Sequence, residues 1–165
     1  MSLQPFVAAG PVIQLHIAAA VCAIVLGPLA LARRSRDRWH KRAGYSWIMA
    51  MVVLSSTGLF IHSIRLVGPF SPIHLLSLLT LWQLFLGVRD ARAGRIAAHR
   101  HRMQSLYALA LMLTGAFTLY PERLMSRILF PDMPVTGFVV VAVLIGPGCA
   151  WWVYSISRQS IRPRG

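Results

Sequence analysis

Six histidines carry the most distinctive chemistry in this chain of 165 residues, which has only four acidic side chains. Neutral imidazole nitrogens bind haem iron, copper and zinc. His16, His62 and His74 lie near the ends of three long apolar stretches. His40 and the pair His99 and His101 lie in two arginine-rich segments that we expect to be loops between helices. The spacing therefore predicts two separate layers of imidazoles.

His62 and His74 flank a helix-stopping segment, 68–72, which reads Gly-Pro-Phe-Ser-Pro. We expect the two rings to meet at one depth, where a pair of imidazoles suits the axial positions of haem b. His16 would be a third or a replacement ligand. Three imidazoles could alternatively bind copper or zinc. As a further alternative, histidines between membrane helices can form packing contacts without binding any ligand.

The second layer, His40, His99 and His101, admits other ligands. Arginines beside these rings would pair with the propionates of a second haem, formed by His40 with His99. A quinone or a phospholipid headgroup suits the same surroundings. A solvated basic loop, with no ligand, is the structural alternative.

Long apolar stretches must position these histidines. The chain is 56% hydrophobic and 13% charged, and its mean hydropathy of +0.61 is unlike that of a soluble domain. A bilayer core of about 30 Å needs about 20 mostly apolar residues per helix. Five stretches meet or approach this length, which predicts an all-α membrane protein of five transmembrane helices: 11–32, 43–64, 73–88, 103–120 and 135–157.

Basic residues predict the orientation. Lys and Arg number 17, for a formal net charge of +13, and they concentrate in segments 33–42, 89–102 and 158–164. Short loops rich in Lys and Arg stay cytoplasmic. We therefore expect the N-terminus outside, the C-terminus inside, and a multi-pass protein of the bacterial cytoplasmic membrane. The positive charge then faces anionic headgroups, and no nucleic-acid partner is needed.

Smaller features predict how the helices pack. Gly27, Gly115 and the run Ser55–Gly58 permit close approach of helices. Segment 122–130 is amphipathic and suits the outer membrane interface. An aromatic belt is expected at the cytoplasmic side, formed by Trp39, Trp47, Trp151, Trp152 and Tyr154.

Several chemistries are disfavoured by the sequence. A Ser-His-Asp arrangement, a P-loop, an H-E-x-x-H motif and a dinucleotide fingerprint are missing from it. Asp90 and Glu122 lie at predicted helix ends, so the spans lack the central carboxylate that a proton- or sodium-coupled carrier usually needs.

Several motifs together resemble the domain-of-unknown-function 2306 family of predicted bacterial membrane proteins. They are Gln14-Leu15-His16, the run 40–45 (His-Lys-Arg-Ala-Gly-Tyr), the segment 60–77 with its two histidines, the run 99–103 (His-Arg-His-Arg-Met) and the run 117–123. The resemblance covers about residues 11–130 and implies a polytopic bundle with recurring histidines and no established activity. It leaves residues 131–165 outside, so the fifth helix is expected to be an addition that serves for docking.

The sequence favours a four-helix histidine-containing bundle with its outer amphipathic segment (1–130), followed by a peripheral helix and basic tail (131–165). The leading expectation is a haem b protein that passes electrons to or from quinone. The alternative is a non-catalytic accessory or assembly subunit of a respiratory or photosynthetic membrane complex, in one variant handling copper through the outer histidines.

Overall fold

The computed structural model describes residues 4–33, 37–61, 72–119 and 123–130, with positions 135, 136, 139 and 143. These residues are helical and contain no strand. The chain forms two compact units, one of Val7–Leu111 and one that joins Met1–Phe6 to Met112–Gly165. Most of the predicted fifth span, 135–157, lies outside the described residues. His62 also lies outside them.

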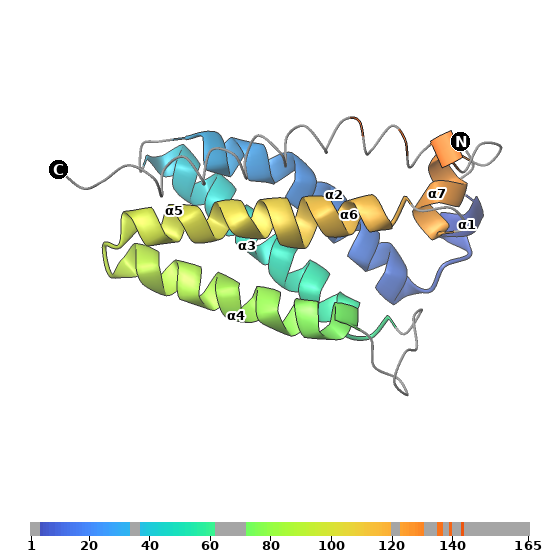
Figure 1. The fold of residues 1–165 in the computed structure, drawn as a ribbon, viewed down its shortest axis with the longest axis horizontal. Helices are drawn as coiled ribbons and strands as arrows, with labels where there is room; N and C mark the ends of the chain where they lie inside the picture. The colour runs from blue at the N-terminus through green and yellow to red at the C-terminus, as the bar shows by residue number, and fades with distance from the viewer. Residues whose placement is uncertain are drawn as a thin grey trace. The chain divides into compact units, whose positions relative to one another are not determined.

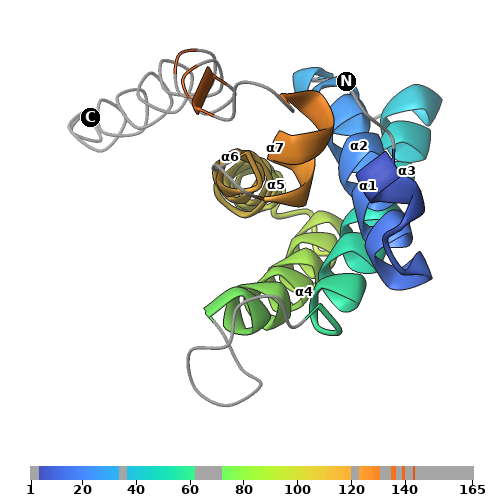
Figure 2. The same ribbon diagram turned by 90° about the vertical axis from the view of Figure 1, so that its right-hand side faces the viewer.

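The larger unit is a bundle of long helices. They are α2 (Pro11–Ala32), α3 (Arg38–Gly58), α4 (Pro72–Arg92) and α5 (Ile96–Ser105), which continues into a π-helix, η1 (Leu106–Leu113). α3 packs on α2 and α4, and α4 packs on α5 (Figure 1). The shorter helices are α1 (Gln4–Val7), α6 (Thr114–Phe117) and α7 (Leu124–Leu129) (Figure 2).

The helix boundaries agree closely with the predicted spans for α2 and at the start of α4, whereas α3 ends at Gly58, before the end predicted at residue 64. α2 begins at Pro11, whose missing N–H costs nothing at the first helical position, and it ends at Ala32 as predicted. α3 begins earlier than predicted because Asp37 caps it: the Asp37 side chain accepts a hydrogen bond from the His40 backbone N–H at 2.7 Å. The expectation that His40, His99 and His101 lie in loops is wrong, since all three are within α3 or α5.

A Schellman motif ends α4. Gly94 has φ of +75°, a left-handed conformation that glycine adopts without strain. The Arg95 N–H bonds to the Asp90 carbonyl at 2.9 Å, and the Gly94 N–H bonds to the Ala91 carbonyl at 3.4 Å. The short turn sends α5 back along α4. The two basic connections, α2 to α3 and α4 to α5, consequently lie at the same end of the bundle (Figure 1).

Burial in α4 is inverted relative to a water-soluble helix. His74, Ser77, Thr80 and Asp90 are each less than 9% exposed. The opposite face exposes large apolar side chains: Leu75, Leu78, Trp82 and Phe85 are between 55% and 70% exposed. In water this arrangement would leave apolar area open to solvent, whereas in lipid the polar groups belong inside the bundle.

The same inversion governs α2. Its buried residues are all small, Ala19, Ala23, Gly27 and Ala30, and its larger residues, such as Val25 and Leu29, face outward. Small side chains let helix backbones approach closely where no hydrophobic effect drives association. Among the described residues, α2 is the one helix long and apolar enough to cross a membrane by length and composition alone. α3 and α4 have 21 residues each, and charged residues at one end of each helix lower the mean hydropathy: Arg38, Lys41 and Arg42 in α3, and Arg89, Asp90 and Arg92 in α4.

Three glycines mark the closest helix contacts. A Cβ at Gly27 would lie 2.1 Å from Tyr107 Cε2, and one at Gly87 would lie 2.1 Å from Met103 Cε. At Gly58 the nearest atom would be Ser77 Oγ, at 3.0 Å. Close approach at Gly27 and Gly58 was predicted; at Gly115 no atom lies within 4 Å.

Trp47 corrects the predicted aromatic belt. Its side chain is 1% exposed and its indole nitrogen lies at Gly27, so Trp47 is a core residue between helices. Trp39, in contrast, is 64% exposed near the basic end, as the belt requires.

The Tyr107 hydroxyl replaces a backbone hydrogen bond that Pro28 removes from α2. Pro28 has no N–H, so the carbonyl of Ile24, four residues earlier, loses its helical donor. The Tyr107 hydroxyl donates to that carbonyl at 3.2 Å. In lipid no water can take this role, so the contact couples η1 to α2.

We predict that Tyr107→Phe lowers the free energy of unfolding in detergent by about 1 kcal/mol, because the Ile24 carbonyl loses its donor. Pro28→Ala restores a backbone N–H at that position. The cost of Tyr107→Phe should therefore shrink in the Pro28→Ala background. Equal costs in both backgrounds would show that the hydroxyl does not serve this carbonyl.

Candidate functional site

His16 is the best-defined member of the first histidine layer, which was expected at the outer membrane face with His62 and His74. Its Nδ1 lies 3.0 Å from Thr57 Oγ1, which joins α2 to α3. The Thr57 hydroxyl donates its one proton back to α3, where the Val53 carbonyl lies at 2.7 Å and the Leu54 carbonyl at 3.0 Å. The hydroxyl is therefore the acceptor for the ring, and Nδ1 of His16 carries the proton. That tautomer leaves Nε2 with a lone pair.

A third helix, α4, reaches the same place. A Cβ at Gly58 would lie 3.0 Å from Ser77 Oγ and 3.5 Å from His16 Cε1, so both groups flank Gly58. His74 is one turn before Ser77 on α4 and is 6% exposed. The structure thus brings His16, Ser77 and His74 to one end of the bundle.

The predicted ligand set is only partly described. His62, expected beside His74, lies outside the described residues. Within the described part of the chain, no three His, Cys, Asp or Glu side chains form a group that could hold a metal ion. A metal site at this end would require His62 in addition to His16 and His74.

His40 and His99 of the second histidine layer bond to helix backbones. Nδ1 of His40 donates to the Ala30 carbonyl at 3.2 Å, and Nδ1 of His99 donates to the Gly87 carbonyl at 2.9 Å. Carbonyl oxygens only accept, so both rings carry the proton on Nδ1. His40 thereby joins α3 to α2, and His99 joins α5 to α4. No hydrogen bond between His40 and His99 is present in the described residues, and His101 is exposed.

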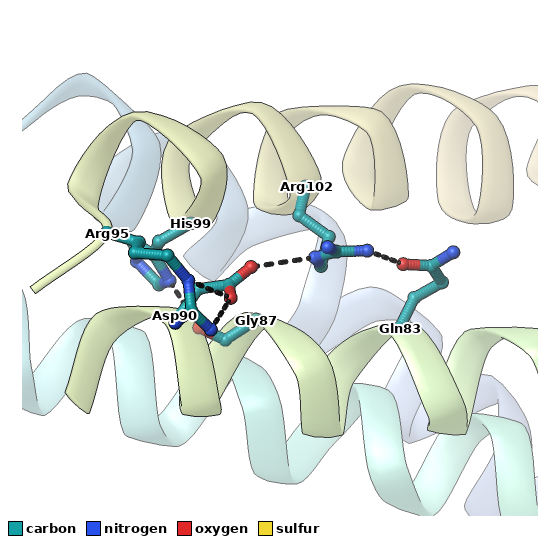
Figure 3. Close-up of polar contacts among 6 residues, drawn as sticks. All are labelled: Gln83, Gly87, Asp90, Arg95, His99 and Arg102. Carbon is teal, nitrogen blue, oxygen red and sulfur yellow. Dashed lines mark hydrogen bonds and ion pairs between the residues drawn. The ribbon is translucent and has the colours of Figure 1, made fainter. Parts of the chain in front are cut away.

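An ion network surrounds Asp90 that was not foreseen from the sequence (Figure 3). Asp90 is 3% exposed near the C-terminus of α4, where the helix dipole disfavours a carboxylate. Arg95 Nη2 lies 2.6 Å from Asp90 Oδ1, and Arg102 Nε lies 3.1 Å from Oδ2. Arg102 also donates to the Gln83 side chain. The network holds the α4–α5 turn and engages two of the basic residues that had been interpreted only as topology signals.

Arginine contacts set the acid strength of Asp90. The Arg95 hydrogen bond is the largest influence and lowers the pKa of Asp90, burial opposes this, and Arg102 lowers the pKa further. The pKa of Asp37 is also lowered, first by the His40 backbone N–H and then by Arg33, whose guanidinium lies 2.6 Å away. Both carboxylates are therefore ionised at neutral pH.

A sequence model of the DUF2306 family, described as "Predicted membrane protein", matches residues 13–156. The chain belongs to this family. No curated protein and no solved structure gives a significant match. The family assignment agrees with the inverted burial of α2 and α4 and identifies a membrane protein.

The family match corrects one expectation. The resemblance seen in the sequence ended near residue 130, which made the fifth span an addition particular to this chain. The match extends to residue 156 and so includes most of the 135–157 stretch. The fifth segment is therefore a regular part of the family.

We predict that the wild-type protein loses thermal stability as pH falls below about 4. A carboxylate whose folded pKa is depressed stabilises the fold above its unfolded pKa, and the stabilisation disappears as pH falls through the folded pKa. Asp90→Asn should lower the melting temperature at pH 7 and flatten the acid-side decline.

Asp37→Asn provides the comparison, because it removes the charge that pairs with Arg33, keeps an N-cap oxygen for the His40 N–H, and leaves the α4–α5 turn intact. Identical acid-side profiles for wild type and Asp90→Asn, measured by circular dichroism in detergent, would contradict the role of Asp90 in holding this turn.

Proposed function

We propose that this family member is a multi-pass protein of the bacterial cytoplasmic membrane with five spans, an outer N-terminus and a cytoplasmic C-terminus. Support comes from the antiparallel order of α2 to α5, which puts both basic connections at one end of the bundle. Short basic loops at one end are what the positive-inside rule requires.

We propose further that the outer histidines bind a transition-metal ion, with copper the favoured metal. The observation that carries this is the contact of His16 with Thr57, which holds the ring in the tautomer whose Nε2 can ligate. Metal-binding histidines usually donate the N–H of their other ring nitrogen to a hydrogen-bond acceptor, as Nδ1 of His16 does to Thr57. Asp37 and Asp90, the acidic residues in the described part of the chain, belong to other contacts, so the nitrogen donors described at this end are the imidazoles of His16 and His74.

The packing at Gly58 favours an ion over a larger cofactor. Ser77 and His16 both lie against Gly58, so α2, α3 and α4 touch at this level. A metal ion needs only ligand distances of about 2 Å. A metal site in a bundle without an enzymatic motif fits an accessory or assembly subunit that delivers or retains copper for a larger membrane complex.

Haem b is the second candidate, with His62 and His74 as axial ligands and quinone as the electron partner. The burial of His74 favours it, because an imidazole inside a membrane bundle commonly marks a cofactor or a pathway. The close contact at Gly58 leaves no room for a porphyrin between α2, α3 and α4 at that level. A haem would therefore lie toward His62, and the inner pair His40 and His99 would serve as interhelical contacts.

Both candidates are tested on protein purified from membranes without chelators. We expect about one bound copper per chain, measured by elemental analysis, and its loss in His16→Ala and His74→Ala. His101→Ala is the matched control, because His101 is exposed and should keep the metal.

A sharp absorption band of reduced low-spin haem, lost in His74→Ala, would instead establish the second candidate. Protein without copper and without such a band, after reconstitution with each, would refute both.

A further inference from the structure

A cavity of about 320 Å³ opens at the start of α3, lined by Asp37, Arg38, Trp39 and Arg42. It lies at the basic end of the bundle, away from the histidines of the outer layer. Its lining combines two guanidinium groups with an indole ring, a composition that suits an anionic group next to an apolar one.

The acidic residue of this cavity is already engaged. Asp37 pairs with Arg33 at 2.6 Å and caps the helix through the His40 N–H. Its charge is therefore compensated and does not repel an incoming anion strongly. Within the described residues, neither Arg38 nor Arg42 forms an ion pair.

The arginines on the other basic connection differ. Arg95 and Arg102 are both held by the buried Asp90. Arg38 and Arg42, in contrast, keep guanidinium donors for an external ligand. Among the arginines of this end of the bundle, Arg95 and Arg102 thus belong to an ion network on α4–α5, whereas Arg38 and Arg42 on α3 lie outside the ion pairs of the described residues.

The exposed side chain of Trp39 indicates that the anionic group belongs to a lipid. Its side chain is 64% exposed, and the Arg42 guanidinium lies 5.7 Å from its ring centroid. An exposed indole beside arginines suits the headgroup level of a bilayer, where one side of the ring meets acyl chains and the other meets water.

We propose that this cavity binds the phosphate headgroup of an anionic phospholipid, with Arg38 and Arg42 on the phosphate and Trp39 against the glycerol and upper acyl region. The proposal rests on the membrane orientation proposed above and is independent of any metal. Guanidinium groups pair with phosphate through two parallel hydrogen bonds, which gives directional recognition in addition to charge.

The test titrates the purified full chain in a neutral detergent with dioctanoyl phosphatidylglycerol and counts bound lipid by native mass spectrometry. Combined Arg38→Gln and Arg42→Gln should weaken binding by at least about tenfold, since each basic residue contributes about a factor of five near an anionic surface. The control removes equal charge from exposed α4 positions, Arg89→Gln with Arg92→Gln, and should stay within about twofold.

Dioctanoyl phosphatidylcholine and inorganic phosphate form the other arms. Weak binding of both supports the proposal. Equal weakening by the two variant pairs would overturn it in favour of diffuse attraction, and displacement of the lipid by equimolar phosphate would overturn it in favour of a free anion. Circular dichroism verifies that each variant is folded, and metal content separates this result from the histidine proposal.

Discussion

The rest of the structure depends on one constraint: inside lipid, a backbone carbonyl or N–H must find its partner within the protein. Pro28 and the helix ends leave such groups without a helical hydrogen-bond partner. Side chains of neighbouring helices, or of a capping residue, supply that partner. Tyr107 donates to the Ile24 carbonyl, His40 donates to the Ala30 carbonyl near the end of α2, and Asp37 accepts from the first turn of α3. Each contact either joins two helices or caps the start of a helix. Satisfying the backbone hydrogen bonds therefore also fixes the arrangement of the bundle.

The same solvent explains why polar residues are inside. Lipid gives no advantage to burying leucine, so contacts between helices come from small residues and from hydrogen bonds. Gly27, Gly58 and Gly87 admit Tyr107, Ser77 and Met103. Interhelical hydrogen bonds form beside these contacts, from Tyr107 to Ile24, between His16 and Thr57, and from His99 to Gly87. The contact of His16 with Thr57 lies where this close approach occurs at Gly58.

The sequence predicted the elements better than their contacts. The bounds of α2 follow from an apolar run between Pro11 and an arginine cluster, a local signal that tertiary structure did not alter. Trp47 was assigned to the interface because depth can be read along a helix, but the face that it occupies depends on Gly27 of another helix. The Asp90 network could not be foreseen in detail, because it requires the Schellman turn at Gly94 to return Arg95 and Arg102 to the carboxylate. The position of His16 was predicted, whereas its Thr57 partner came only from packing.

Lipid exposure of α4 tests the central claim most directly. A nitroxide at Leu78 or Phe85, and another at Thr80, can be compared in liposomes by their collision rates with oxygen, which partitions into acyl chains, and with a nickel chelate, which stays in water. We predict high oxygen and low nickel access at Leu78 and Phe85, and low access to both reagents at Thr80. High nickel access at Leu78 and Phe85 would mean that water surrounds this helix, and lipid could then not be the solvent that places the polar groups of α4 inside the bundle.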